Sequence, residues 1–154
     1  MSIIQKISIA SSPETVWEVL MQRMSFPEDF QPDIIEKSFP LENENEFIRR
    51  VETEHGGVTE QFLLDEPNKT MKINLIKHPY FSGNSVFSIQ KIETETELTI
   101  EYNWIPKTKE DFSDILPKAI TNLAEIIKNT AEADEEFAHE DFDDDDEGSA
   151  TESE

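Results

Sequence analysis

The chain has 154 residues, long enough for one domain with a hydrophobic core, and its formal net charge is −22. It contains no cysteine, which excludes disulfides, thiolate metal sites and cysteine nucleophiles. A surface this acidic repels nucleic-acid phosphates and anionic lipid head groups, so we expect no nucleic-acid binding. Nothing in the composition predicts an oligomer, so we expect a monomer.

Residues 1–10 predict a strand, because Ile3, Ile7 and Ile9 stand among polar residues in an alternating pattern. Lys6 interrupts this segment, unlike the apolar core of a secretion signal. No apolar run approaches the roughly 18 residues that span a bilayer, so no membrane insertion is expected. We therefore expect a cytoplasmic protein, with a nuclear location as the alternative.

A first helix is predicted from Pro13, because Ser12 is a good helix cap and proline suits the first helical position. The short segment between Pro27 and Pro32 predicts one more helical turn. The apolar residues of the first helix recur at helical spacing, at Val16, Trp17, Leu20, Met21 and Met24.

Six further segments predict strands, bounded by turn residues such as Pro40, Gly56 and Gly57. Apolar and polar residues alternate along them, which indicates an antiparallel meander with one face in water. The predicted strands are residues 34–39, 46–55, 58–64, 71–77, 85–92 and 97–104.

Residues 111–129 predict one long amphipathic helix, which needs a sheet to cover. Pro117 lies inside this pattern, where an interior proline costs about 3 kcal/mol, so we expect either a kink or a helix whose strong part begins near Leu116. The apolar face of the helix consists of Phe112, Ile115, Leu116, Ala119, Ile120, Leu123, Ile126 and Ile127. A curved sheet wrapped over one such helix can leave a cavity between them.

The C-terminal segment is strongly acidic: residues 132–154 hold 13 of the 35 acidic residues, and every Lys and Arg precedes it. The body therefore has 13 basic against 22 acidic residues, a net charge of −9. Phe137 and Phe142 are too few large apolar residues to offset chain entropy. We predict a folded domain at residues 1–130 and an acidic, disordered tail at residues 131–154, which either binds a basic protein partner or only solubilises the chain.

The order of the predicted elements resembles the helix-grip fold of the START-like, birch-pollen-allergen-like (SRPBCC) superfamily. The residues that carry the resemblance are ISIASSPETVWEVL at the start, LTIEYNWIPK in the last strand and ILPKAITNLAEIIKN in the closing helix, and it covers residues 2–129. The local sequence is most similar to the AtaL-like branch. The resemblance implies an α+β fold, in which a curved antiparallel sheet of six or seven strands wraps around the long C-terminal helix. It also implies a hydrophobic cavity for an aromatic, polyketide-like or lipid molecule, without a catalytic signature to carry over residue by residue.

Two charged residues, Arg49 and Glu60, fall on the apolar faces of their strands. Strict alternation places Arg49 on the same side as Val51, and Glu60 on the same side as Phe62. If these faces are concave, Arg49 and Glu60 point into the cavity, where they could form an ion pair, bind an acidic ligand group, or provide a base with a raised pKa. The alternative is that a bulge shifts the register and both residues lie in water, because a slip of one residue inverts every assignment.

The aromatic residues Tyr102 and Trp104 share the apolar face of the last predicted strand. They could stack on a flat ligand, with the hydroxyl and indole N–H groups orienting it, or they could only pack against the closing helix. Phe62, Ile73 and Ile120 complete the predicted ligand-binding set.

The sequence predicts no metal site and no cofactor. His55, His78 and His139 are too widely spaced for two of them to share one helix turn. No nucleophile-elbow motif and no phosphate-binding glycine pattern is present. A calcium-loop spacing that begins at Asp143 has glutamate at its fifth position and no exiting helix, so we interpret it as chance.

Three functions follow from these patterns. The first hypothesis is a noncatalytic or weakly catalytic domain that binds a hydrophobic, aromatic small molecule. A second hypothesis is a cyclase-like enzyme in which an inward carboxylate or tyrosine moves a proton. A third is a protein-interaction adaptor that acts through the acidic tail.

Overall fold

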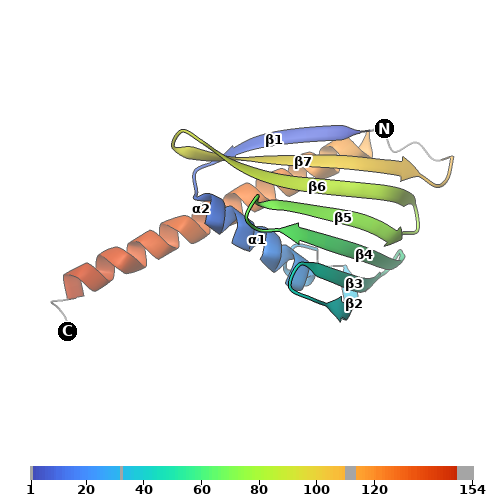
Figure 1. Cartoon of the computed structure of the whole chain (residues 1–154), viewed down its shortest axis with the longest axis horizontal. Helices are drawn as coiled ribbons and strands as arrows, with labels where there is room; N and C mark the ends of the chain where they lie inside the picture. The colour runs from blue at the N-terminus through green and yellow to red at the C-terminus, as the bar shows by residue number, and fades with distance from the viewer. Residues whose placement is uncertain (1, 32, 110–113, 149–154) are drawn as a thin grey trace.

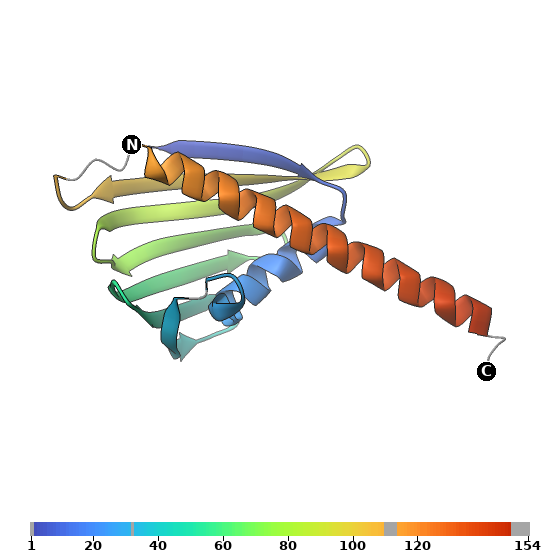
Figure 2. The same cartoon turned by 180° about the vertical axis from the view of Figure 1, so that it is seen from behind.

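The structure is a computed structural model that describes residues 2–31, 33–109 and 114–148, with side chains only as far as residue 136. Seven strands form one antiparallel sheet in the order β1-β7-β6-β5-β4-β3-β2. Both α-helices lie on one face of the sheet, and α2 crosses it diagonally before extending past its edge (Figures 1 and 2). The elements are β1 (Ile3–Ile9), α1 (Pro13–Ser25), the 3-10 turn η1 (Pro27–Asp29), β2 (Ile34–Glu42), β3 (Glu46–Thr53), β4 (Gly56–Asp65), β5 (Thr70–Lys77), β6 (Phe81–Ile92), β7 (Glu95–Pro106) and α2 (Ile115–Gly148). This is the predicted α+β arrangement of a curved sheet around a long C-terminal helix.

The N-terminal half of the fold matches its sequence signals closely. The Ser12 hydroxyl accepts a hydrogen bond from the Thr15 amide, and Pro13 occupies the first turn of α1, as predicted. The segment after Pro27 forms the expected single turn, η1. These two short helices carry the chain from the edge of the sheet back across its face.

Two of the predicted strand boundaries are wrong. β2 continues through Pro40 to Glu42, because an edge strand needs no amide donor on its open side, and its pairing with β3 is irregular between Ser38 and Leu41. Gly56 and Gly57 begin β4 instead of forming the turn, which falls on the two residues before them. The remaining strands lie where the alternation placed them: β1 is slightly shorter than predicted, β5, β6 and β7 begin one to four residues earlier, and β7 also ends two residues later.

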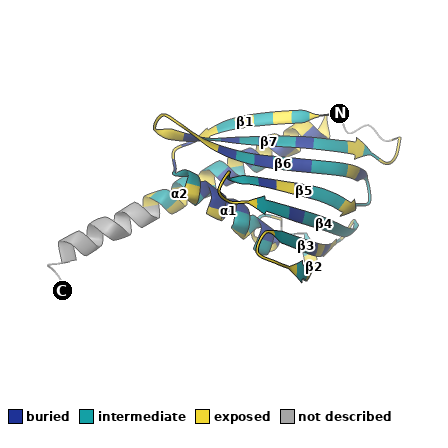
Figure 3. Cartoon of the chain, viewed as in Figure 1, coloured by how far each residue is buried: buried dark blue, intermediate teal, exposed yellow. Residues whose placement is uncertain are grey.

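The inner face of the sheet is apolar and buried. Along β7, buried residues alternate with half-buried ones at Thr96, Leu98, Ile100 and Tyr102, and the same alternation marks the neighbouring strands (Figure 3). The central core combines these strand residues with Val16, Val19, Leu20 and Met24 of α1 and with Ile120, Ala124 and Ile127 of α2.

The first turn of α2 explains how the helix tolerates its proline. α2 begins at Ile115, so Pro117 lies in the first turn, where backbone amides have no partner within the helix. The prediction that the strong part of the helix begins near Leu116 is therefore correct, and no kink is required. The predicted helical residues 111–113 lie outside the described residues.

The predicted end of this helix near Asn129 is wrong, because α2 continues to Gly148. Ala131 is fully buried and extends the apolar face by one more turn, and no glycine or proline interrupts the chain before Gly148. The sequence interpretation counted only large apolar residues and so overlooked Ala131. The division of the chain at residue 130 and the disorder of the tail stay predictions. Within the described residues, no helix is both long and apolar enough to cross a bilayer.

Two glutamates fix α2 to the start of α1. The carboxylate of Glu135 accepts hydrogen bonds from the Ser12 amide and the Thr15 hydroxyl, both at 3.0 Å, and Glu132 accepts one from the Ala10 amide at 2.8 Å. The Ser12 and Thr15 bonds hold the pKa of Glu135 below its ordinary value of 4.5. Glu135 thus gives negative charge and an acceptor to the N-terminus of α1, where both are favourable.

Replacing Glu135 by alanine should therefore destabilise the protein by about 1 kcal/mol in urea unfolding at pH 7. Because the folded pKa is depressed, this contribution is complete above pH 4.5 and is lost as the pH falls through the folded pKa. Glu136→Ala removes the same charge from an exposed neighbouring position and is the control. Equal effects of the two variants would contradict the assigned contact.

Candidate functional site

A cavity of about 360 Å³ lies between the inner face of the sheet and α2. Strands β3 to β7 form one wall, and the end of α1 and the segment that follows it form another. α2 closes the third side with Leu116, Ala119, Asn122, Leu123 and Ile126. Ala119 and Asn122 are exposed, so this side reaches the surface.

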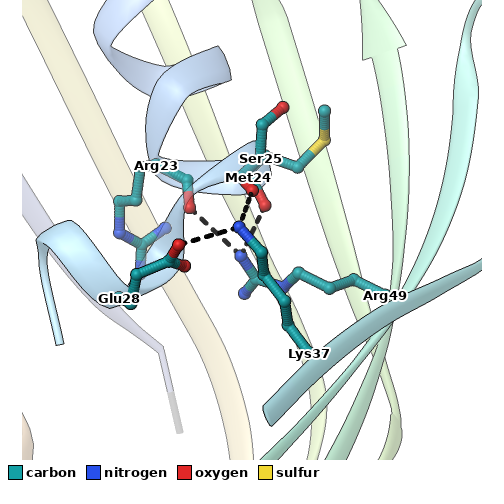
Figure 4. A network of polar contacts seen from close by, with 6 residues as sticks. All are labelled: Arg23, Met24, Ser25, Glu28, Lys37 and Arg49. Atoms are coloured by element: carbon teal, nitrogen blue, oxygen red, sulfur yellow. Dashed lines mark hydrogen bonds and ion pairs between the residues drawn. The ribbon is translucent and has the colours of Figure 1, made fainter. Parts of the chain in front are cut away.

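Arg49 joins the sheet to the last turn of α1 (Figure 4). The side chain of Arg49 is buried, and its Nη1 donates to the carbonyls of Arg23 at 3.1 Å and Met24 at 2.9 Å. Its Nη2 contacts Glu60 Oε1 at 2.6 Å, and its guanidinium lies 4.7 Å from the Phe62 ring centroid. The arginine therefore satisfies helix carbonyls that lack partners within α1 and also pairs with a carboxylate.

Lys37 adds a second cation at the same helix end. Its Nζ donates to the Ser25 carbonyl at 2.8 Å and to the Glu28 carboxylate at 2.9 Å (Figure 4). Positive charge is favourable at a helix C-terminus because the terminal carbonyls carry partial negative charge. β2 and β3 thus hold α1 against the rim of the cavity.

Arg23, on the last turn of α1, lines the cavity wall together with Arg49. Its position follows Leu20 by three residues and Val16 by seven, which is the apolar face of α1. The side chain is half-buried and its guanidinium lies 5.5 Å from the Phe87 ring centroid. Among the described residues, no carboxylate forms an ion pair with it.

Tyr102 and Trp104 stack on one another in the cavity wall, with ring centroids 4.5 Å apart and planes 13° apart. Burial raises the pKa of the Tyr102 hydroxyl, which therefore keeps its proton at neutral pH. Gly83 pairs with Trp104, and a Cβ at this glycine would meet the Asn103 carbonyl at 2.0 Å. Only glycine allows the two strands to approach closely enough to place Trp104 here.

His78 completes the polar part of the wall. Its Nδ1 accepts hydrogen bonds from the amides of Tyr80 at 3.0 Å and Phe81 at 3.2 Å, so the ring proton is on Nε2. Burial lowers the pKa of His78, with a smaller contribution from Lys107 against the opposing effect of Glu60. The ring is therefore neutral at pH 7 and offers a donor.

The structure brings most of the predicted site residues together. Arg49 and Glu60 are directly opposed on β3 and β4 and face the cavity as an ion pair, so the alternative that both lie in water is wrong. Ile73, Tyr102 and Trp104 also line the cavity.

Phe62 and Ile120 do not line the cavity but are fully buried in the core. The sequence interpretation missed Arg23 and treated His78 only as a possible metal ligand. An arginine on the apolar face of a helix was the signal for Arg23. Within the described ranges, no three acidic or histidine side chains gather into a group that could hold a metal ion.

No family model matches the sequence, and no curated protein matches it. Solved structures do share its fold. The Zhui aromatase/cyclase from Streptomyces sp. R1128 is 14% identical with a TM-score of 0.64, over 88% of this chain and 93% of that chain. Ara h 8.0201 is 10% identical with a TM-score of 0.66, over 86% and 95% of the two chains.

A START superfamily protein from Mycobacterium smegmatis is 15% identical with a TM-score of 0.63, over 89% of this chain and 98% of that chain. At these identities the likeness establishes the fold alone. The START-like helix-grip fold expected from the sequence is confirmed, whereas the AtaL-like branch stays a prediction.

The Arg49 contacts yield a stability prediction. Arg49→Met should lower the free energy of unfolding by about 3 kcal/mol, because it leaves Glu60 and two helix carbonyls without their partner. Arg50→Met, on the exposed side of the same strand, should change it by less than about 0.5 kcal/mol. Urea unfolding measures both, and a small effect at Arg49 would contradict its role in fixing α1.

Proposed function

We propose that this protein binds a hydrophobic, aromatic small molecule in the cavity between the sheet and α2. The observation that carries the proposal is the cavity itself, about 360 Å³ in volume and bordered by rings and aliphatic side chains. Ligand sites of small molecules have volumes of about 300 to 1,000 Å³ and combine apolar walls with a few polar groups. This cavity has both features.

The aromatic character of the ligand is supported by the rings around the cavity. Phe30, Phe87, Tyr102 and Trp104 all line it. Flat rings of a ligand can lie against such side chains in stacked or edge-to-face contacts, which add about 0.5 to 1.5 kcal/mol per pair to the burial of apolar area. The resemblance to the AtaL-like branch, and the fold shared with a protein described as an aromatase/cyclase, support the same ligand class.

A cyclase-like activity is the alternative that the inward position of Glu60 and Tyr102 favours. The carboxylate of Glu60, however, bonds to Arg49 at 2.6 Å, so accepting a proton would leave a buried guanidinium without its counter-ion. Burial raises the pKa of Tyr102, so its phenol stays protonated at neutral pH, where it cannot accept a proton and is only a weak acid. These contacts favour binding over proton transfer. Binding of a basic protein by the acidic tail stays a separate prediction.

The proposal is tested by filling the cavity. Leu123→Trp places an indole in the wall contributed by α2 and should raise the Kd of the fluorescent apolar probe N-phenyl-1-naphthylamine by about tenfold or more, because the probe loses the space it occupies. Ala133→Trp adds the same ring to an exposed position of α2 outside the cavity and should leave the Kd unchanged. Unchanged binding to Leu123→Trp, with its fold intact by circular dichroism, would show that the cavity is not the site.

A further inference from the structure

The cavity wall carries more positive than negative charge. Its charged residues are Arg23, Arg49 and Glu60. The Glu60 carboxylate bonds to Arg49, and two carbonyls of α1 accept from the same guanidinium. Arg23 is thus the cation of the wall that has no bonded carboxylate among the residues the structure describes.

Arg23 is partly removed from water, yet its guanidinium stays protonated. Burial lowers the pKa of its guanidinium, the nearby Tyr102 raises it, Arg49 lowers it and Glu60 raises it. A guanidinium nevertheless remains protonated in proteins. Its guanidinium lies 5.5 Å from the centroid of the Phe87 ring, a cation–π geometry that replaces only part of the lost hydration. A desolvated cation of this kind is unfavourable until an anion joins it.

The backbone under Arg23 is held in place. Its own carbonyl and that of Met24 accept hydrogen bonds from Arg49, and the next carbonyl accepts one from Lys37 (Figure 4). The root of the Arg23 side chain is therefore fixed by contacts that do not involve its guanidinium. A cation on a fixed backbone loses less conformational entropy when it binds a ligand than a cation on a mobile loop does.

Three polar side chains of the cavity wall, Tyr102, His78 and Trp104, offer hydrogen-bond donors. Tyr102 keeps its phenolic proton because burial raises its pKa, and His78 carries its proton on Nε2. The indole N–H of Trp104 is buried and has no acceptor in the described part of the chain. A buried donor without an acceptor is costly, so these groups match a ligand that supplies acceptor oxygens.

We propose that the ligand is an aromatic acid whose carboxylate, or an equivalent oxyanion, pairs with the Arg23 guanidinium. This inference rests on the proposed function and names the class of ligand for the same cavity. A guanidinium fork binds a planar carboxylate through two parallel hydrogen bonds, and the aromatic body then lies against the rings of Phe87, Tyr102 and Trp104. The ligand thereby supplies the negative charge that the wall lacks.

The charge of the whole protein makes this inference easy to test. At a net charge of −22 the chain repels anions at long range, so any electrostatic gain in affinity for an anionic ligand comes from the local charge at the site. Removing Arg23 should therefore affect an anionic ligand strongly and a neutral one little.

Two fluorescent probes share one ring system and differ in charge: 1-anilinonaphthalene-8-sulfonate is an anion, and N-phenyl-1-naphthylamine lacks the sulfonate. Arg23→Gln should raise the Kd of the anionic probe by about tenfold or more and change that of the neutral probe by less than about twofold. Arg50→Gln removes an equal charge from the exposed side of β3 and should change neither Kd appreciably. Arg23→Lys should recover part of the affinity for the anionic probe, because it restores the charge without the planar fork.

Several results would overturn the inference. The two probes could lose affinity equally in Arg23→Gln, or Arg50→Gln could weaken the anionic probe as much as Arg23→Gln does. Arg23→Met, which keeps the aliphatic stem, gives the same comparison if the glutamine variant does not fold. Without ligand, the Tm of Arg23→Met should be no lower than that of the wild type. A clearly lower Tm would show that the charge of Arg23 is already compensated within the protein. Failure of the neutral probe to bind the wild type would instead refute the proposed function.

Discussion

The buried guanidinium of Arg49 determines how α1 and the sheet meet. A helix ends with carbonyls that have no partner within it, and α1 ends above the apolar face of the sheet, where water cannot satisfy all of them. Arg49 lies only 5% exposed on β3, donates to two of these carbonyls and pairs with Glu60 on β4. One side chain thereby connects three elements. It also fixes the backbone of Arg23 at the cavity.

The cavity follows from an unequal packing of α2 along its length. Toward its middle, Ala124 and Ala131 bring the helix close to its neighbours, and Ile127 is fully buried. The contacts of Glu132 and Glu135 with the start of α1 hold that part in place. Nearer its beginning, the exposed residues Ala119 and Asn122 border the cavity. The cavity occupies the space between this part of the helix and the inner face of the sheet.

The sequence predicted the architecture well, because alternation and helical spacing are direct consequences of burying one face of each element. Alternation also predicted that Arg49 and Glu60 lie on the apolar faces of their strands, and the regular pairing of β3 with β4 places them directly opposite one another. Alternation alone could not decide whether these residues face inward, because this depends on the register of the whole sheet. The end of α2 was missed since a small residue, Ala131, can pack as well as a large one against a close neighbour.

Arg23 was missed for a different reason. A charge on an apolar helix face is usually interpreted as a residue near the edge of that face, with its head group in water. The ion pair between Arg49 and Glu60 is what shows that Arg23, the third charged residue of the cavity wall, has no carboxylate to pair with there. The pattern of α1 alone indicates an inward arginine, but whether its charge is paired depends on strands distant in sequence, so no pattern within one element could reveal that it is not.

The most direct test of the account is native mass spectrometry of the protein purified from its own source, followed by denaturation and identification of any released small molecule. We predict one apolar aromatic molecule bound to each chain, and an acidic group on that molecule. A protein that is empty, and that also fails to take up either naphthylamine probe, would contradict the claim that this fold serves as a container.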